Sequence, residues 1–156
     1  MDIQDPDYQN RVAQIFEKAP FLKNLGVKLQ SCGPGSCESF LEIQNYHKQQ
    51  DRLVHAGVVA TLADHTAGGA ASSLLKPGES VLTVDFHLQL LRAGKGRRLL
   101  CKSRVLKSGP RLCFAESEVF AVGEEGEKLI ARASVTLAVR SPAADPAPYP
   151  QESEPT

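Results

Sequence analysis

The groups in this chain best suited to chemistry are a carboxylate and backbone amides within LVHAGVVATLADHTAGGAASSLL, residues 53–75. The pattern predicts one long helix of small and apolar residues, ended by Lys76-Pro77-Gly78, with Asp64 at its middle. An isolated carboxylate is costly to remove from water, so Asp64 is a candidate general base or nucleophile. The alternative is that Asp64 only hydrogen-bonds within the protein or lies at an exposed helix edge.

The start of the same helix offers a second group, because free N–H groups and the helix dipole favour an anion there. Ala56 and Gly57 are the candidate oxyanion donors. Ala56 is eight positions from Asp64, or about 12 Å along a helix axis, too far for both to act on one carbonyl. If both serve one site, the helix start of one subunit must meet Asp64 of another. The sequence therefore suggests a homodimer with sites in its interface.

Small residues that we expect to surround Asp64 would leave room for a substrate or a second chain: Ala60, Ala67, Gly68 and Ala71.

The histidines and cysteines suggest less chemistry. His55 could polarise a carbonyl, but at a helix entrance we favour a structural hydrogen bond. His65 follows Asp64 directly, so on a helix the two side chains diverge by about 100° and we expect a surface or interface histidine. Neither residue type has metal-ligand spacing, and no G-x-S-x-G motif is present, so we predict neither a metal site nor a serine nucleophile.

A basic run is the second notable feature. Between Arg92 and Arg111 no acid occurs, but eight basic residues do: Arg92, Lys95, Arg97, Arg98, Lys102, Arg104, Lys107 and Arg111. Such a run is usually a solvated strand face balanced by acids elsewhere. It could also grip phosphate, for which Arg is well suited. Nucleic acid is disfavoured because the run lacks interleaved aromatic residues.

Composition indicates one ordinary globular domain without a strong charge bias. The chain has 156 residues, 42% of them hydrophobic, and a net charge of zero. Its start has no signal-peptide pattern. Residues 56–75 have the length of a membrane span, but Asp64 and His65 near their centre favour a buried helix. We therefore expect no membrane partner, and free thiols in a reducing cytoplasm.

Period-two and helical patterns predict an α+β fold. A helix is expected over 8–19, a loop over 45–54, and strands over 26–32, 36–44, 81–91, 98–107, 111–122 and 129–139. In 81–91 one face should carry Leu82, Val84 and Phe86, and the other Thr83 and Asp85. Consecutive strands with short turns indicate a curved antiparallel sheet of five to six strands wrapped around the long helix.

We divide the chain into a helical N-terminal segment (1–19), a main domain (20–140) and a tail (141–156). The tail holds five of the ten prolines and no lysine or arginine, a composition typical of disorder.

The stretch H-A-G-V-V-A-T-L-A-D, from His55 to Asp64, resembles the H-G-G-x-x-x-x-L-x-D signature of hotdog-fold acyl-CoA thioesterases of the phenylacetic-acid-degradation type. Later segments resemble that family in order and spacing: T-V-D-F, L-L-R-A-G-K-G, K-S-G-P-R and A-R-A-S-V-T-L. The match covers roughly residues 20–140. The resemblance implies a hotdog fold for this domain.

The resemblance also implies site residues. Asp64 would be the catalytic carboxylate, and the amide at Ala56, where the family has glycine, would polarise the thioester carbonyl across a dimer interface. Gln49 stands where some members have an assisting Asn, and Thr83 where some have a hydroxyl residue.

With this resemblance, the basic run is best explained as a site for the phosphates of coenzyme A. Arg111, in the turn that starts at Gly109, is the first choice, with Lys107 and Arg92 behind it.

The expected reaction is hydrolysis of an acyl-CoA thioester to the acid and free CoA, with no cofactor besides the CoA of the substrate. We expect a homodimer, assembled into a homotetramer if the chain follows its relatives, and no nucleic-acid partner. Two alternatives stay open: a hotdog enoyl-CoA hydratase, with an acid/base pair around Asp64 that could include His55, and a non-catalytic acyl-CoA-binding module.

Overall fold

The computed structural model describes residues 3–141. Its helices are α1 (Tyr8–Lys18), α2 (Pro20–Leu25), the short 3-10 helix η1 (Asn45–His47) and α3 (Ala56–Ser72). Its strands are β1 (Lys28–Gly33), β2 (Ser36–Glu42), β3 (Ser80–Leu90), β4 (Arg98–Ser108), β5 (Leu112–Gly123) and β6 (Gly126–Arg140).

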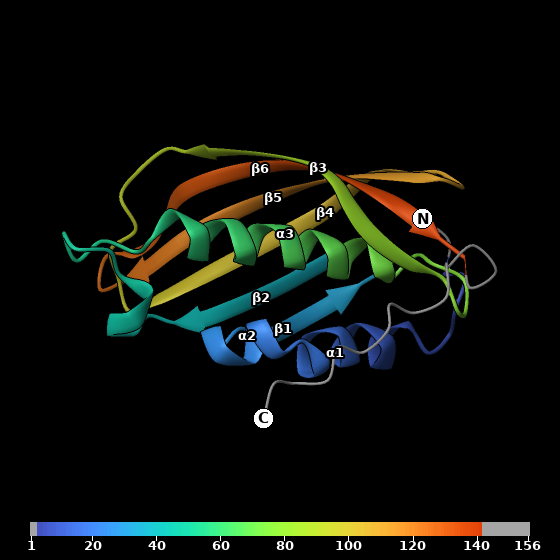
Figure 1. Cartoon of the computed structure of the whole chain (residues 1–156), viewed down its shortest axis with the longest axis horizontal. Helices are drawn as coiled ribbons and strands as arrows, with labels where there is room; N and C mark the ends of the chain where they lie inside the picture. Colours follow the sequence, from blue (N-terminus) through green and yellow to red (C-terminus); the bar gives the residue numbers. More distant parts are fainter. Residues whose placement is uncertain (1–2, 142–156) are drawn as a thin grey trace, which may run out of the picture.

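The strands form one antiparallel sheet in the order β1-β2-β4-β5-β6-β3. Figure 1 shows α3 lying lengthwise along one face of this sheet, with α1 and α2 beside β1. The predicted α+β architecture, a long helix against a curved antiparallel sheet, is therefore confirmed, with six strands.

The core lies between α3 and the sheet. From α3 it receives mainly small side chains together with Leu62, and from β4, β5 and β6 it receives alternate residues such as Leu99, Val119 and Leu137. All four are fully buried. Small residues on α3 allow the helix and sheet backbones to approach closely, and alternation along the strands directs the paired charged side chains to the opposite face.

The N-terminal helices cover the β1 side of the molecule. The helix predicted over 8–19 is confirmed as α1, which buries Val12 and Phe16 in the common core. The sequence pattern did not predict α2, which begins at Pro20 just after α1 ends. Proline is also well tolerated at the first position of a helix, where its missing N–H has no partner to lose.

The predicted assignment of β3 side chains to the two faces of the sheet is wrong for residues 82–84, which precede a shift in the strand pairing. The pairing of β3 with β6 shifts between Thr83 and Asp85, which makes Val84 a bulge residue. Thr83 therefore faces α3, on the same side of the sheet as Phe86, while Val84 is 57% exposed. A bulge inserts one residue and reverses the alternation from that point, which no period-two count can anticipate.

The long helix is also shorter than predicted. Residues 53–55 precede the helix: Val54 forms a bridge with Lys48 and donates its N–H to the Gly94 carbonyl, and His55 is extended. After Ser72 the chain continues in turns that bond back to α3.

All four cysteines are free thiols, and Cys32 lies opposite Cys37 across the β1–β2 hairpin. No helix within residues 3–141 is long and apolar enough to cross a membrane. The predicted tail lies outside the described residues except for Ser141, and the division at residue 20 stays a prediction.

Candidate functional site

Asp64 lies on the face of α3 that is turned away from the sheet core, at the edge of a cavity of about 440 Å³ between α1, α3 and β3. Its carboxylate is half-buried and accepts a hydrogen bond of 2.8 Å from the Thr83 hydroxyl to Oδ1. The bond fixes one carboxylate oxygen, and none of the described residues bonds Oδ2. A held carboxylate beside a largely apolar cavity is suited to a general base or a nucleophile.

The β3 bulge produces this contact. Thr83 pairs with Leu137 of β6, whose side chain points into the core, so Thr83 also points toward α3. The structure thus joins two predicted residues from elements 19 positions apart in sequence.

The start of α3 is built around His55. His55 is extended and is the N-cap residue, and its Nδ1 accepts the Gly57 N–H at 2.9 Å. The neutral ring therefore carries its proton on Nε2. This is the structural role that the sequence favoured for His55. It also means that the Gly57 amide, predicted as an oxyanion donor, is already occupied.

The Ala56 amide differs from that of Gly57. No described residue accepts its N–H, and Ala56 is exposed at the first position of α3. It lines a second cavity of about 470 Å³ together with Gln49, His55 and Arg92. Four predicted residues from three separate segments thus meet at the helix start.

A buried histidine holds this loop in place. His47 is 1% exposed; its Nδ1 accepts the Gln44 N–H, its Nε2 contacts the Leu25 carbonyl, and its own carbonyl accepts the His55 N–H. No role for His47 was predicted from the sequence. The signal was local, a Gln44-to-His47 spacing that forms a capping box.

The two groups of predicted residues do not meet within one chain. The first group includes Ala56 and lies around the start of α3. The second group, Asp64 and Thr83, lies two helical turns further along α3. The separation of about 12 Å expected from helix geometry is unchanged, because both residues lie within one continuous helix.

Two of the four small residues expected around Asp64 lie elsewhere. Ala67 and Ala71 are buried in the sheet-facing core, while Ala60 and Gly68 are partly exposed on the side of Asp64.

The basic run does not form one cluster. Arg98, Lys102 and Arg104 of β4 form ion pairs with Glu42 of β2, Glu127 of β6 and Glu116 of β5, which is the solvated strand face that composition favoured. Arg92 lies in the cavity at the start of α3. Gly109 lines a different cavity beside Leu74 and Leu75 at the far end of the helix.

Lys107 and Arg111 flank Gly109, so they also lie at the far end of α3. The whole length of β4 separates these two residues from the loop that contains Arg92. For a strand of 11 residues this length is about 33 Å. Arg92 therefore cannot bind the same phosphate as Lys107 and Arg111 within one chain.

His65 packs against α1 instead of lying on the protein surface. Its ring stacks edge-on against Phe16 with centroids 4.7 Å apart. Burial lowers the pKa of His65, although the Asp64 carboxylate and the Ile15 backbone act in the opposite direction. His65 is thus neutral near pH 7 and forms a wall of the cavity beside Asp64.

The described residues supply no alternative nucleophile or metal centre. Burial raises the pKa of the Cys32, Cys37 and Cys113 thiols, and raises that of Cys101 to about 11, so these thiols are protonated near neutral pH. Within residues 3–141, no group of three or more His, Cys, Asp or Glu side chains is placed to hold a metal ion.

Comparison with known proteins places residues 52–128 in a family model described as the thioesterase superfamily. A Pseudomonas aeruginosa protein that carries the name "putative esterase" is 32% identical over 95 residues, which cover 60% of this chain and 68% of that protein.

Solved structures of thioesterase proteins match a larger part of this chain. A thioesterase family protein from Silicibacter pomeroyi is 31% identical, with a TM-score of 0.83 over 85% of this chain and 97% of its own. The zebra fish thioesterase superfamily member 2 is 27% identical, with a TM-score of 0.71 over 83% of this chain and 96% of its own.

Proposed function

This chain belongs to the thioesterase superfamily and has its hotdog fold, and on that premise we propose that it hydrolyses an acyl-CoA thioester to the free acid and coenzyme A. One observation carries the proposal: Thr83 holds the Asp64 carboxylate at the edge of a largely apolar cavity. The resemblance of residues 55–64 to the phenylacetic-acid-degradation signature supports an assignment to that branch.

Asp64 supplies the base or the nucleophile. As a base, it takes a proton from water while the water oxygen attacks the thioester carbonyl; the C–S bond then breaks, and the CoA thiolate leaves and is protonated. As a nucleophile, its free oxygen attacks the carbonyl, the C–S bond breaks, and the CoA thiolate leaves and is protonated; water then hydrolyses the resulting anhydride to the free acid and restores the Asp64 carboxylate. In both routes the Thr83 hydroxyl keeps Oδ1 in place and leaves Oδ2 for the reaction.

The Ala56 amide is the oxyanion donor. Its N–H is free, it stands at the positive end of a helix of 17 residues, and it needs no rearrangement to bind a developing anion. Gly57 is excluded from this role by its bond to His55. Gln49 lines the same cavity and can add a side-chain hydrogen bond.

The active site is composite, formed by two copies of the chain. Ala56 of one protomer and Asp64 of its partner act on one carbonyl, because 12 Å separates them within a chain. The edge strand β3 supports this assembly, since Leu82 and Val84 on it are more than half exposed. A two-fold axis then gives two identical sites. Two such dimers form the proposed homotetramer.

The same symmetry gives the basic run a role. A two-fold axis beside Ala60, midway between Ala56 and Asp64, reverses the helix direction, so the part of one helix beyond Asp64 extends past the start of the other. Arg92 of one protomer and Lys107 and Arg111 of its partner then serve one CoA molecule, with Gly109 leaving the turn accessible.

The test uses Ala56→Pro, which deletes one N–H and little else. Proline is accepted at the first helical position, and His55 before it already has the extended conformation that proline requires. Loss of one oxyanion donor lowers kcat by about 10²–10³-fold. Ala56→Ser retains the N–H and is the matched control. Release of CoA thiol from a panel of acyl-CoAs is the measurement.

Mixing two inactive variants tests the shared site. After subunit exchange between Ala56→Pro and Asp64→Asn, a mixed dimer contains one intact site, so a substantial part of the activity returns. Absence of any recovery in verified mixed dimers would contradict the composite site. Hydration of an enoyl-CoA without thiol release, or binding of acyl-CoA without turnover, would contradict the hydrolase itself.

A further inference from the structure

The cavity beside Asp64 continues along α3 away from the helix start. Asp64, Gly68 and Ser72 line it on successive turns, since residues four apart share one helix face. From Asp64 to Ser72 this stripe is about 12 Å long. The cavity volume, about 440 Å³, is within the range of small-ligand pockets.

The walls are mostly apolar. Ile15 of α1 and the neutral His65 form one side, and Val81 and Leu137 form the other. Thr83, the remaining polar side chain at the Asp64 end, is bonded to the carboxylate itself. An apolar group attached to a carbonyl at Asp64 would therefore find apolar contacts along the channel.

Two adjacent glycines differ in the space around them. A Cβ at Gly69 would lie 2.9 Å from Cys37 Sγ and 3.0 Å from Phe16, so Gly69 is required by packing. A Cβ at Gly68 would meet nothing within 4 Å, although Gly68 lines the cavity. Packing within the chain therefore does not explain Gly68, and the space above it is open for a ligand.

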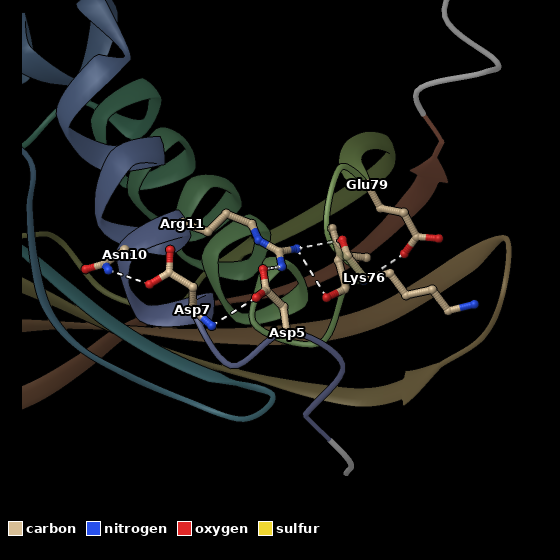
Figure 2. Close-up of polar contacts among 7 residues, drawn as sticks. Asp5, Asp7, Asn10, Arg11, Lys76 and Glu79 are labelled. Atoms are coloured by element: carbon tan, nitrogen blue, oxygen red, sulfur yellow. Dashed lines mark hydrogen bonds and ion pairs between the residues drawn. The ribbon is translucent and has the colours of Figure 1, made fainter.

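Arg11 lines the far end of the channel. Figure 2 shows its guanidinium between Asp5 and the end of α3: Nη1 donates to the Leu75 and Lys76 carbonyls at 3.2 and 3.1 Å, and Nη2 pairs with the Asp5 carboxylate. Beside it, the Glu79 carboxylate accepts the Lys76 N–H. Because two carbonyls bind Nη1 and the Asp5 carboxylate pairs with the guanidinium charge, we treat this end of the channel as a wall rather than a site for a charged group.

We propose that this channel is the acyl subsite, with Gly68 setting its width and the Arg11 contacts setting its depth. The substrate class is an acyl-CoA with an extended, unbranched, apolar acyl group of medium length, without a charge at its far end. This inference rests on the proposed hydrolase function and names its substrate class.

The experiment measures kcat/KM for straight-chain acyl-CoAs from acetyl to palmitoyl in the wild type, Gly68→Ala and Gly68→Val. The wild type is expected to prefer medium lengths. Valine narrows the channel beyond Asp64, so the ratio of medium- to short-chain kcat/KM falls by roughly 10- to 100-fold, and alanine gives a smaller fall. Ser31→Val, an exposed position on β1, is the control for added volume and leaves the ratio unchanged.

A uniform loss over all chain lengths in Gly68→Val would overturn the subsite. So would a change in oligomeric mass by light scattering, because the open space would then belong to a subunit interface. A wild type with highest kcat/KM on acetyl-CoA or on palmitoyl-CoA would contradict the proposed length.

A binding measurement separates this inference from the proposed function. Free carboxylic acids of the same lengths mimic the product, so medium-chain acids should raise the Tm of the wild type more than that of Gly68→Val. If no acyl-CoA is hydrolysed but this difference is found, the hydrolase fails and the channel stands. If hydrolysis is found without a chain-length difference between the variants, the channel fails alone.

Discussion

The two faces of α3 have opposite packing. On the sheet-facing side, the Thr66 hydroxyl lies 2.6 Å from that of Ser39, and the Ser117 hydroxyl donates to the Ala63 carbonyl. On the other side, Asp64 has a single side-chain partner and Gly68 faces open space. Packing therefore explains the residues of the first face, whereas those of the second need a ligand or a second chain to explain them.

This contrast explains the order of residues in the helix. Small residues occur on both faces, but for different reasons: Gly69 lets Cys37 and Phe16 approach, and Gly68 leaves a cavity beside the carboxylate. A single pattern of small residues thus serves backbone packing on one side and substrate access on the other.

The largest expected effect tests the open face of α3, the face that carries Asp64 and Gly68. Asp64→Asn should lower kcat for thioester hydrolysis by about 10²–10⁴-fold, because the amide can neither take a proton nor attack a carbonyl. Its Tm should stay near that of the wild type, since the amide oxygen can still accept from Thr83. Asp85→Asn, on the outer face of the same strand as Thr83, is the matched control. Full activity of Asp64→Asn would mean that the open face of α3 does not supply the catalytic carboxylate.

The next effect compares the two faces through one methyl group. Gly69→Ala should destabilise the fold by about 1–3 kcal/mol, because the added Cβ overpacks the core. Gly68→Ala should stabilise it by up to about 1 kcal/mol through helix propensity, because its Cβ meets nothing. Urea unfolding of both variants is the measurement. Equal destabilisation would mean that both faces are closed by packing.

The smallest effect concerns His65, which lies between the two faces. Because burial lowers its pKa in the folded state, the unfolded chain binds more protons as the pH falls below about 6.5. Stability should therefore decrease as the pH falls through the window between the ordinary pKa and the lowered one. His65→Gln should show a weaker decrease in urea titrations from pH 7 to 5. An unchanged slope would mean that His65 titrates as an exposed residue.

The sequence predicted much of the fold because burial follows local periodicity. Alternate burial in β5 and β6, such as Cys113, Ala115, Ala133 and Val135, agrees with the pattern. The Val84 bulge could not be predicted, since an inserted residue leaves the composition of the strand unchanged. Ala67 was misplaced for a similar reason: alanine suits a buried and an exposed helix face equally well.

The site was predicted less completely because it combines distant segments. Asp64 and Ala56 could be identified within one helix, and Thr83 by its position after that helix. Arg11 and Ile15 come from α1, about 50 residues before Asp64, and reach the cavity only through tertiary packing. The ion pairs that divide the basic run also depend on strand register.

The bulge at Val84 also constrains how this gene can change in length. Losing one residue from β3 before the bulge would turn Thr83 away from α3, whereas losing Val84 itself would restore regular pairing and move either Thr83 or Phe86 to the outer face. Either deletion exchanges a site residue or a core residue for an exposed one. Single-residue insertions and deletions in β3 should therefore be strongly selected against, while the β5–β6 turn, where Glu124 and Glu125 are exposed, can change in length far more freely.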